Sequence, residues 1–113
     1  MTDKELLELA AKAAGMPVGS APGAYQYRDD GIWVSGMYGT DNGYPLFWNP
    51  LIDDRDALRL AVSAPTIIDL QWIIAEAWQA HDEFDARMAY VRRAIVEKIA
   101  LPFARTTDTG GEA

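Results

Sequence analysis

Three aspartates within four positions, Asp53, Asp54 and Asp56, are the first residues whose types suggest chemistry. Mg²⁺ and Ca²⁺ bind several oxygen ligands, so a metal-dependent enzyme is one hypothesis. However, side chains at positions i, i+1 and i+3 of a helix start do not all converge, and no EF-hand-like spacing or glycine follows. Asp53 fits a helix N-cap, and Asp54 and Asp56 fit a first turn, where the helix dipole favours negative charge. We therefore predict capping rather than a metal site.

A second acidic group surrounds His81, the chain's only histidine, which precedes Asp82, Glu83 and Asp85. Histidine titrates near neutral pH, so this group is a candidate general base or metal site. The acids are also typical of the start of a helix. The chain contains no cysteine, which excludes disulfides, thiol catalysis and cysteine-ligated zinc. We predict no catalytic residue, no metal and no cofactor.

Aromatic side chains are concentrated between Tyr25 and Trp48, where seven of the chain's twelve occur. Such a cluster binds nucleic acid when basic residues are interleaved with it. Arg28 is the only Lys or Arg in this interval, so we predict no nucleic-acid binding. Two alternatives stay open: the aromatic residues form one face of a sheet core, or they line a small-molecule or peptide pocket under the loop at 36–43. The candidates for contact with a ligand or partner are Tyr25, Trp33, Tyr38, Tyr44 and Trp48, with the three aspartates beside them.

The composition sets limits on the class of protein. A chain of 113 residues, half of them hydrophobic, predicts one globular domain. No apolar run approaches the length of a membrane span, so we predict no membrane partner. The formal net charge is −7. An acidic surface suits a basic partner protein, although net charge also keeps a small protein soluble.

Strands are predicted in two parts of the chain. Residues 25–28 and 32–35 alternate around the turn signal Asp29-Asp30-Gly31, which indicates a hairpin, and a glycine-rich loop follows. Residues 66–74 alternate and are rich in β-branched side chains, which favours a strand. A helix is the alternative, since Ile67, Leu70, Ile74 and Ala77 fit one helix face. Whether residues 66–80 form one strand, a hairpin or a helix stays open.

Two helices are predicted before residue 65. A capping-box pattern, Thr2-Asp3-Lys4-Glu5, begins the first, which runs from about Asp3 to Ala14 with Gly15 as its C-cap. The second follows Asp53 and stops at Ser63-Ala64-Pro65, because the residue before a proline is pushed out of the α region. Its predicted apolar stripe consists of Ala57, Leu58, Ala61 and Val62.

A long amphipathic helix is predicted near the C-terminus, ending at Pro102. Its apolar stripe consists of Phe84, Met88, Val91, Ile95 and Ile99. Together the elements predict an α+β fold: a small antiparallel sheet, made of a hairpin plus one or two further strands, packed with three helices. We predict a single domain over residues 1–103 and a disordered C-terminal tail over residues 104–113.

Two stretches of the chain resemble a known family. Trp48 to Val62 looks like the "WNPL-DD-DALRLAV" segment of short phage and prophage proteins, and Arg92 to Val96 looks like the "RRAIV" start of their closing helix. From the first helix to about Leu101, the chain is similar to the phage α-β-α (ABA) sandwich domain group, small proteins of unassigned function. The resemblance implies a phage-encoded protein that acts in the cytoplasm of a bacterial host, and it supplies no catalytic residues.

Three functions are therefore considered. The first is an accessory binding protein without catalytic activity, acting against host defence or in host takeover by blocking a host bacterial protein. The second is a protein that binds and sequesters a small ligand such as a signalling nucleotide, with a homodimer or higher homo-oligomer supplying cationic groups. The third, ranked last, is a metal-dependent enzyme.

Overall fold

The computed structural model describes residues 1–16, 31–34, 46–64 and 66–112. Helices take up 71 % of these residues. The predicted α+β fold with a multi-stranded sheet is therefore wrong, because the described part of the chain is mostly helical. Its elements are α1 (Asp3–Ala13), β1 (Ile32–Val34), β2 (Leu46–Trp48), α2 (Asp54–Ser63), α3 (Leu70–Ala80) and α4 (Phe84–Glu112).

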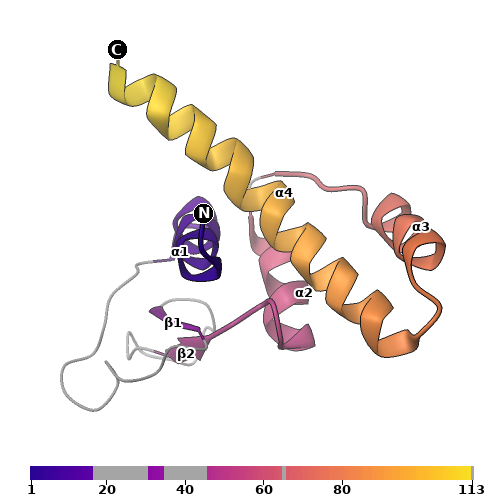
Figure 1. The fold of residues 1–113 in the computed structure, drawn as a ribbon. Helices are drawn as coiled ribbons and strands as arrows, with labels where there is room; N and C mark the ends of the chain where they lie inside the picture. The colour runs from indigo at the N-terminus through magenta and orange to yellow at the C-terminus, as the bar shows by residue number, and fades with distance from the viewer. Residues whose placement is uncertain (17–30, 35–45, 65, 113) are drawn as a thin grey trace.

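The long helix α4 is the element on which the other helices pack (Figure 1). α1, α2 and α3 each contact α4, and α1 also contacts β1. In Figure 1, α1 lies on one side of α4 and α3 lies on the other, beside the first turns of α4. The fold is therefore three shorter helices and a small ribbon arranged along one long helix.

α1 begins and ends where the sequence predicts. The Thr2 hydroxyl oxygen accepts a hydrogen bond from the Glu5 N–H at 3.1 Å, which satisfies one of the donors left free at a helix start. At the other end Gly15 has a φ of +79°, and the Met16 N–H donates to the Ala11 carbonyl at 2.9 Å. This left-handed glycine closes the helix in a Schellman arrangement.

The strands form a two-stranded antiparallel ribbon. β1 pairs with β2 in the register Ile32 to Trp48 and Val34 to Leu46. The strand predicted at 32–35 is confirmed over its first three residues. The partner strand predicted at 25–28 lies outside the described residues. β2 enters directly into the turn that precedes α2, so the ribbon positions the start of that helix.

α2 is confirmed as a helix with Asp53 as its N-cap and Ala64, before Pro65, as its C-cap. The predicted apolar stripe is wrong in part, because Leu58 and Val62 are 57 % and 78 % exposed. The buried face instead contains Asp56, Ala57 and Leu60. Asp56, a polar residue, occupies a buried position on this face. Leu58 and Val62 therefore lie away from the core.

The strand predicted at 66–74 is wrong, because the chain forms helix α3 from residue 70. The Asp69 side chain accepts a hydrogen bond from the Trp72 N–H at 3.0 Å and caps this helix. Ile73 and Ala77, one turn apart, are its buried residues. Alternation of apolar residues at 68–74 suggested a strand, but the cap and the contact with α4 favour a helix.

α4 continues beyond its predicted end. Pro102 lies inside the helix, which runs to Glu112, so the predicted stop at this proline is wrong. A proline in a helix interior removes one backbone hydrogen bond and is costly, and the sequence rule rests on that cost. The predicted division between a domain at 1–103 and a disordered tail at 104–113 stays a prediction.

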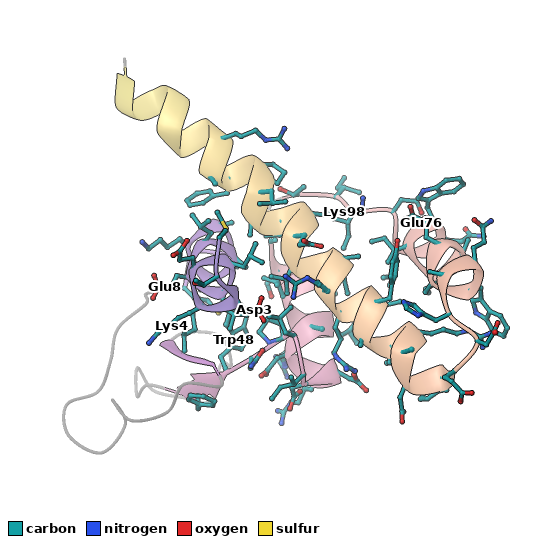
Figure 2. The ribbon with its side chains drawn as sticks, in the orientation of Figure 1. Asp3, Lys4, Glu8, Trp48, Glu76 and Lys98 are labelled. Atoms are coloured by element: carbon teal, nitrogen blue, oxygen red, sulfur yellow. The ribbon has the colours of Figure 1, made fainter. Side chains whose placement is uncertain are left out.

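The core lies where α1, the ribbon, α2 and the middle of α4 meet. Trp48, Leu60, Val96 and Ile99 are among its fully buried side chains. Figure 2 shows Trp48 on the α1 side of the molecule and Glu76, from α3, on the far side of α4. The buried residues of α3 are not part of this core cluster. α3 is therefore a satellite helix that packs on the first turns of α4.

Candidate protein-binding groove

Helix α3 exposes far more apolar surface than a surface helix needs. Eight of its eleven residues are apolar, yet Ile73 and Ala77 are the ones that are buried. Trp72, Ile74 and Trp78 are 62 %, 42 % and 61 % exposed. A helix that is apolar on nearly all sides is typically covered on all sides. α3 therefore has more apolar surface than its contact with α4 covers.

The apolar stripe of α4 also extends beyond the core. The predicted residues Ile95 and Ile99 are buried, Met88 and Val91 are half-buried, and Phe84 is 69 % exposed. The stripe is therefore confirmed near the middle of the helix, and it becomes more exposed toward the helix start. Its uncovered end lies beside the uncovered face of α3.

These surfaces meet in one groove between α2, α3 and α4, with a volume of about 420 Å³. We call it the α2–α3–α4 groove. Its exposed lining residues include Leu58, Trp78 and Phe84, one from each helix. Trp72 does not line it, although it is as exposed as Trp78. The lining consists of Asp54, Ala57, Leu58, Leu70, Ile74, Ala77, Trp78, Phe84, Arg87, Met88, Val91, Arg92 and Ile95.

Arg87 holds the wall of the groove at the α3 end. Its guanidinium carbon lies 3.4 Å from the centroid of the Trp78 ring. Its Nε donates a hydrogen bond to the His81 carbonyl oxygen at 2.8 Å. A cation over an indole face is attracted to it, and the hydrogen bond fixes the guanidinium in place. Arg87 therefore holds the Trp78 ring in place, and its guanidinium group contacts this ring and the His81 carbonyl oxygen.

Arg92 plays a similar part at the α2 end. Its Nε donates to the Leu51 carbonyl oxygen at 2.9 Å, and its Nη1 pairs with Asp54 Oδ1 at 2.6 Å. The Arg92 side chain is only 17 % exposed. This arginine ties α4 to the turn before α2. It therefore also joins residues 48–62 to residues 92–96.

The predicted aspartates have three different roles. Asp53 Oδ1 accepts a hydrogen bond from the Asp56 N–H at 3.0 Å, as a cap. Asp54 pairs with Arg92. Asp56 is buried, and its Oδ2 accepts from the Asn49 N–H at 3.1 Å. Their polar contacts therefore point to separate partners, and Asp54 alone lines the groove.

Of the five aromatic residues predicted as a site, the structure describes the side chain of Trp48. Trp48 is fully buried and belongs to the core, where its indole N–H has no hydrogen-bond partner among the described residues. Trp33 lies in β1. Tyr25, Tyr38 and Tyr44 lie outside the described residues. For Trp48 the structure therefore favours the core alternative over a ligand-stacking surface.

A second, larger hollow runs along the outer face of α4, with a volume of about 800 Å³. It is lined by Tyr90, Lys98 and Arg105 among others, and His81 lies edge-on to Tyr90 at 5.9 Å between ring centroids. Arg93, in the same lining, already pairs with Asp3 at 3.2 Å and lies 3.8 Å from Glu97. Part of the positive charge in this hollow is therefore neutralised within the protein.

The described residues contain neither a metal-binding cluster nor a membrane-spanning helix. Among residues 1–16, 31–34, 46–64 and 66–112, no three His, Cys, Asp or Glu side chains are grouped so that they would hold a metal ion. Within the same ranges no helix is both long and apolar enough to cross a membrane. Comparisons with protein families, with curated proteins and with solved structures found no match to this chain.

Sequence reasoning did not identify the groove residues as a site. Trp78 lies in the segment 66–80, whose structure the sequence leaves open, and Phe84 is predicted only as part of the apolar stripe of the last helix. The signal available in the sequence was the density of Trp and Ile in residues 67–78. Interpreted as a helix, that segment is too apolar for one buried face, which indicates a second contact surface.

Proposed function

We propose that this protein is a non-catalytic binding protein that engages a partner protein in the α2–α3–α4 groove. The observation that carries the proposal is the set of exposed apolar side chains that converge there from three helices. Contiguous apolar surface of this kind marks interaction sites in small proteins. Exposed Trp and Phe side chains are also the residue types that most often anchor protein interfaces.

Covering this surface would contribute substantially to the free energy of binding. Trp78 and Phe84 are 61 % and 69 % exposed, which leaves on the order of 100–170 Å² on each. Covering both contributes roughly 5–8 kcal/mol before the costs of association. Leu58, Ile74 and Met88 add to that area. Trp78 and Phe84 therefore supply a large part of the apolar surface that a partner in the groove would cover.

The setting of this interaction is also a proposal. The resemblance at 48–62 and 92–96 supports a phage-encoded accessory protein whose partner is a host bacterial protein in the host cytoplasm. Blocking a host enzyme or a defence protein is a function that needs binding and no catalysis. The net charge of −7 suits this, because it favours approach to a basic partner surface.

A small-ligand binder is the second candidate, favoured by the hollow along α4 that contains Tyr90, His81 and Lys98. An aromatic ring beside cationic groups is the combination that a nucleotide requires. The groove carries the stronger argument, because Arg93 in the hollow is already paired with Asp3 and Glu97 lies close to it. No step of catalysis is proposed for either surface.

Affinity capture with two matched variants tests the proposal. Trp78→Ala removes a groove side chain, and Trp72→Ala removes an equally exposed one from the same helix outside the groove. We expect one bacterial protein to be retained by the wild type and by Trp72→Ala, and to be lost with Trp78→Ala. The purified partner should reproduce this order in direct binding. A partner retained equally by all three proteins, or no partner at all, would contradict the proposal.

A further inference from the structure

The charges around the α2–α3–α4 groove indicate which partner it takes. Between Arg59 and Arg87 the chain has no Lys or Arg, while it contains Asp69, Glu76, Asp82, Glu83 and Asp85. This interval supplies the whole α3 wall and the start of α4. The segments that bound the groove on that side therefore carry acids and no Lys or Arg before Arg87, while the lining itself is mostly apolar.

The acids beside Phe84 are available to a partner. Asp82, Glu83 and Asp85 are all exposed. Within the described part of the chain, none of their side chains makes a hydrogen bond or an ion pair. They are adjacent to Phe84, the most exposed aromatic residue of the groove lining. An apolar anchor and three unpaired negative charges therefore lie within four consecutive positions.

The two cations of the lining are both engaged with groups of the groove wall. Arg87 lies against the Trp78 ring and donates to the His81 carbonyl oxygen. Arg92 pairs with Asp54 and donates to the Leu51 carbonyl oxygen. Both guanidinium groups are held by the groove wall. A ligand that enters the groove meets apolar side chains, and at the end beside Phe84 it meets an acidic rim made of Asp82, Glu83 and Asp85.

From this arrangement we infer that the occupant of the groove is a basic amphipathic helix of the partner protein. The inference rests on the proposed function. An amphipathic helix places apolar side chains on one face, which fits a groove between helices, and Lys or Arg on its flanks would face the acidic rim. A groove of about 420 Å³ holds a few side chains rather than a folded loop.

A second copy of this chain fits the groove less well. Each copy carries a net charge of −7, so two acidic rims would approach one another. A nucleic acid is excluded by the same charge. A basic helix is the partner for which both the apolar floor and the acidic rim are favourable, and charge attraction also raises its association rate.

Two designed peptides test the inference on the full chain. Both are about 18 residues long, which allows a helix, and both carry the same Leu positions on one face. One has Lys at its polar positions and the other has Glu, residues of similar helix propensity. Binding of fluorescently labelled peptide is measured by anisotropy, with analytical ultracentrifugation to detect self-association of the protein.

We expect the Lys peptide to bind at least tenfold more tightly than the Glu peptide. Its affinity should fall as NaCl rises from about 0.1 M to about 1 M, which shortens the Debye length from about 10 Å to about 3 Å. Phe84→Ala should weaken binding about tenfold, whereas Val62→Ala, an exposed apolar residue of α2 outside the groove, should not. Replacing Asp82, Glu83 and Asp85 by their amides should also weaken binding about tenfold.

Equal binding of the two peptides would overturn the inference, as would equal binding of the Lys peptide to wild type and Phe84→Ala. The second result would show attraction to acidic surface without use of the groove. If the protein self-associates through the groove, a second copy is the occupant and the inference is wrong. If a captured host protein depends on Trp78 but binds through a segment without Lys or Arg, the inference fails while the proposed function stands.

Discussion

Replacement of Asp56 by alanine should destabilise the protein more than replacement of either neighbouring aspartate. Asp56 is 8 % exposed, and its Oδ2 accepts the Asn49 N–H at 3.1 Å. Alanine would leave that buried N–H without this acceptor, at a cost of about 1–3 kcal/mol. For a domain of this size each kcal/mol lowers Tm by about 4 °C, so we expect a fall of roughly 4–12 °C.

Urea unfolding followed by tryptophan fluorescence measures this free energy. Asp56→Asn is the matched control, because its amide oxygen still accepts the hydrogen bond, and it should cost less than about 1 kcal/mol. Asp53→Ala removes the N-cap and should cost about 1 kcal/mol. Asp54→Ala removes an ion pair whose aspartate is 63 % exposed and should cost less than about 1 kcal/mol.

The expected order of destabilisation is Asp56, then Asp53, then Asp54, and it follows from three separate structural roles. A metal site would give a different pattern: each substitution would abolish a stabilisation by Mg²⁺ or Ca²⁺. If Asp56→Ala changes the free energy of unfolding by less than 0.5 kcal/mol, or if Asp54→Ala costs as much as Asp56→Ala, the reasoning from the hydrogen bonds is refuted.

Three further substitutions probe the fold by the same urea assay. Gly31→Ala should cost about 1–3 kcal/mol, because a Cβ there would lie 2.6 Å from the Trp48 carbonyl oxygen; Gly15→Ala, which meets nothing within 4 Å, should cost about 1–2 kcal/mol from its positive φ alone. Trp48→Ala should cost about 3–5 kcal/mol as a fully buried aromatic residue, whereas Trp72→Ala should cost less than about 1 kcal/mol. Arg92→Ala should cost about 1–3 kcal/mol by releasing the Leu51 carbonyl oxygen and Asp54, and Arg92→Lys should not restore the loss, since lysine lacks the planar fork that reaches both groups.

Local signals in the sequence were sufficient for the starts of α1 and α2 and for the end of α1. Thr2 and Asp53 cap α1 and α2 as predicted, because a side-chain oxygen at an N-cap needs only its own next turn. Gly15 ends α1 for an equally local reason. These predictions succeeded because the groups concerned lie within a few residues of one another.

The errors have tertiary causes. In residues 68–74 apolar side chains recur at every second position, as in a strand. However, Asp69 caps a helix, and Ile73 and Ala77 are the buried residues of this helix, which packs on α4. The buried position of Asp56 depends on the Asn49 N–H, seven residues away in the preceding turn, which shifted the buried face of α2. The groove depends on three helices at once. Periodicity within one segment does not contain such information.

Site-specific photo-cross-linking tests the groove most directly. A photoreactive phenylalanine analogue is placed at position 84 in the groove lining, and in a control protein at Lys4, an exposed position on α1. Both proteins are irradiated in bacterial cells and analysed by mass spectrometry. We predict that position 84 cross-links to one host protein, through a segment with Lys or Arg beside apolar residues, and that position 4 does not. No cross-link at position 84, or the same products from both positions, would contradict the assignment of the α2–α3–α4 groove as the binding site.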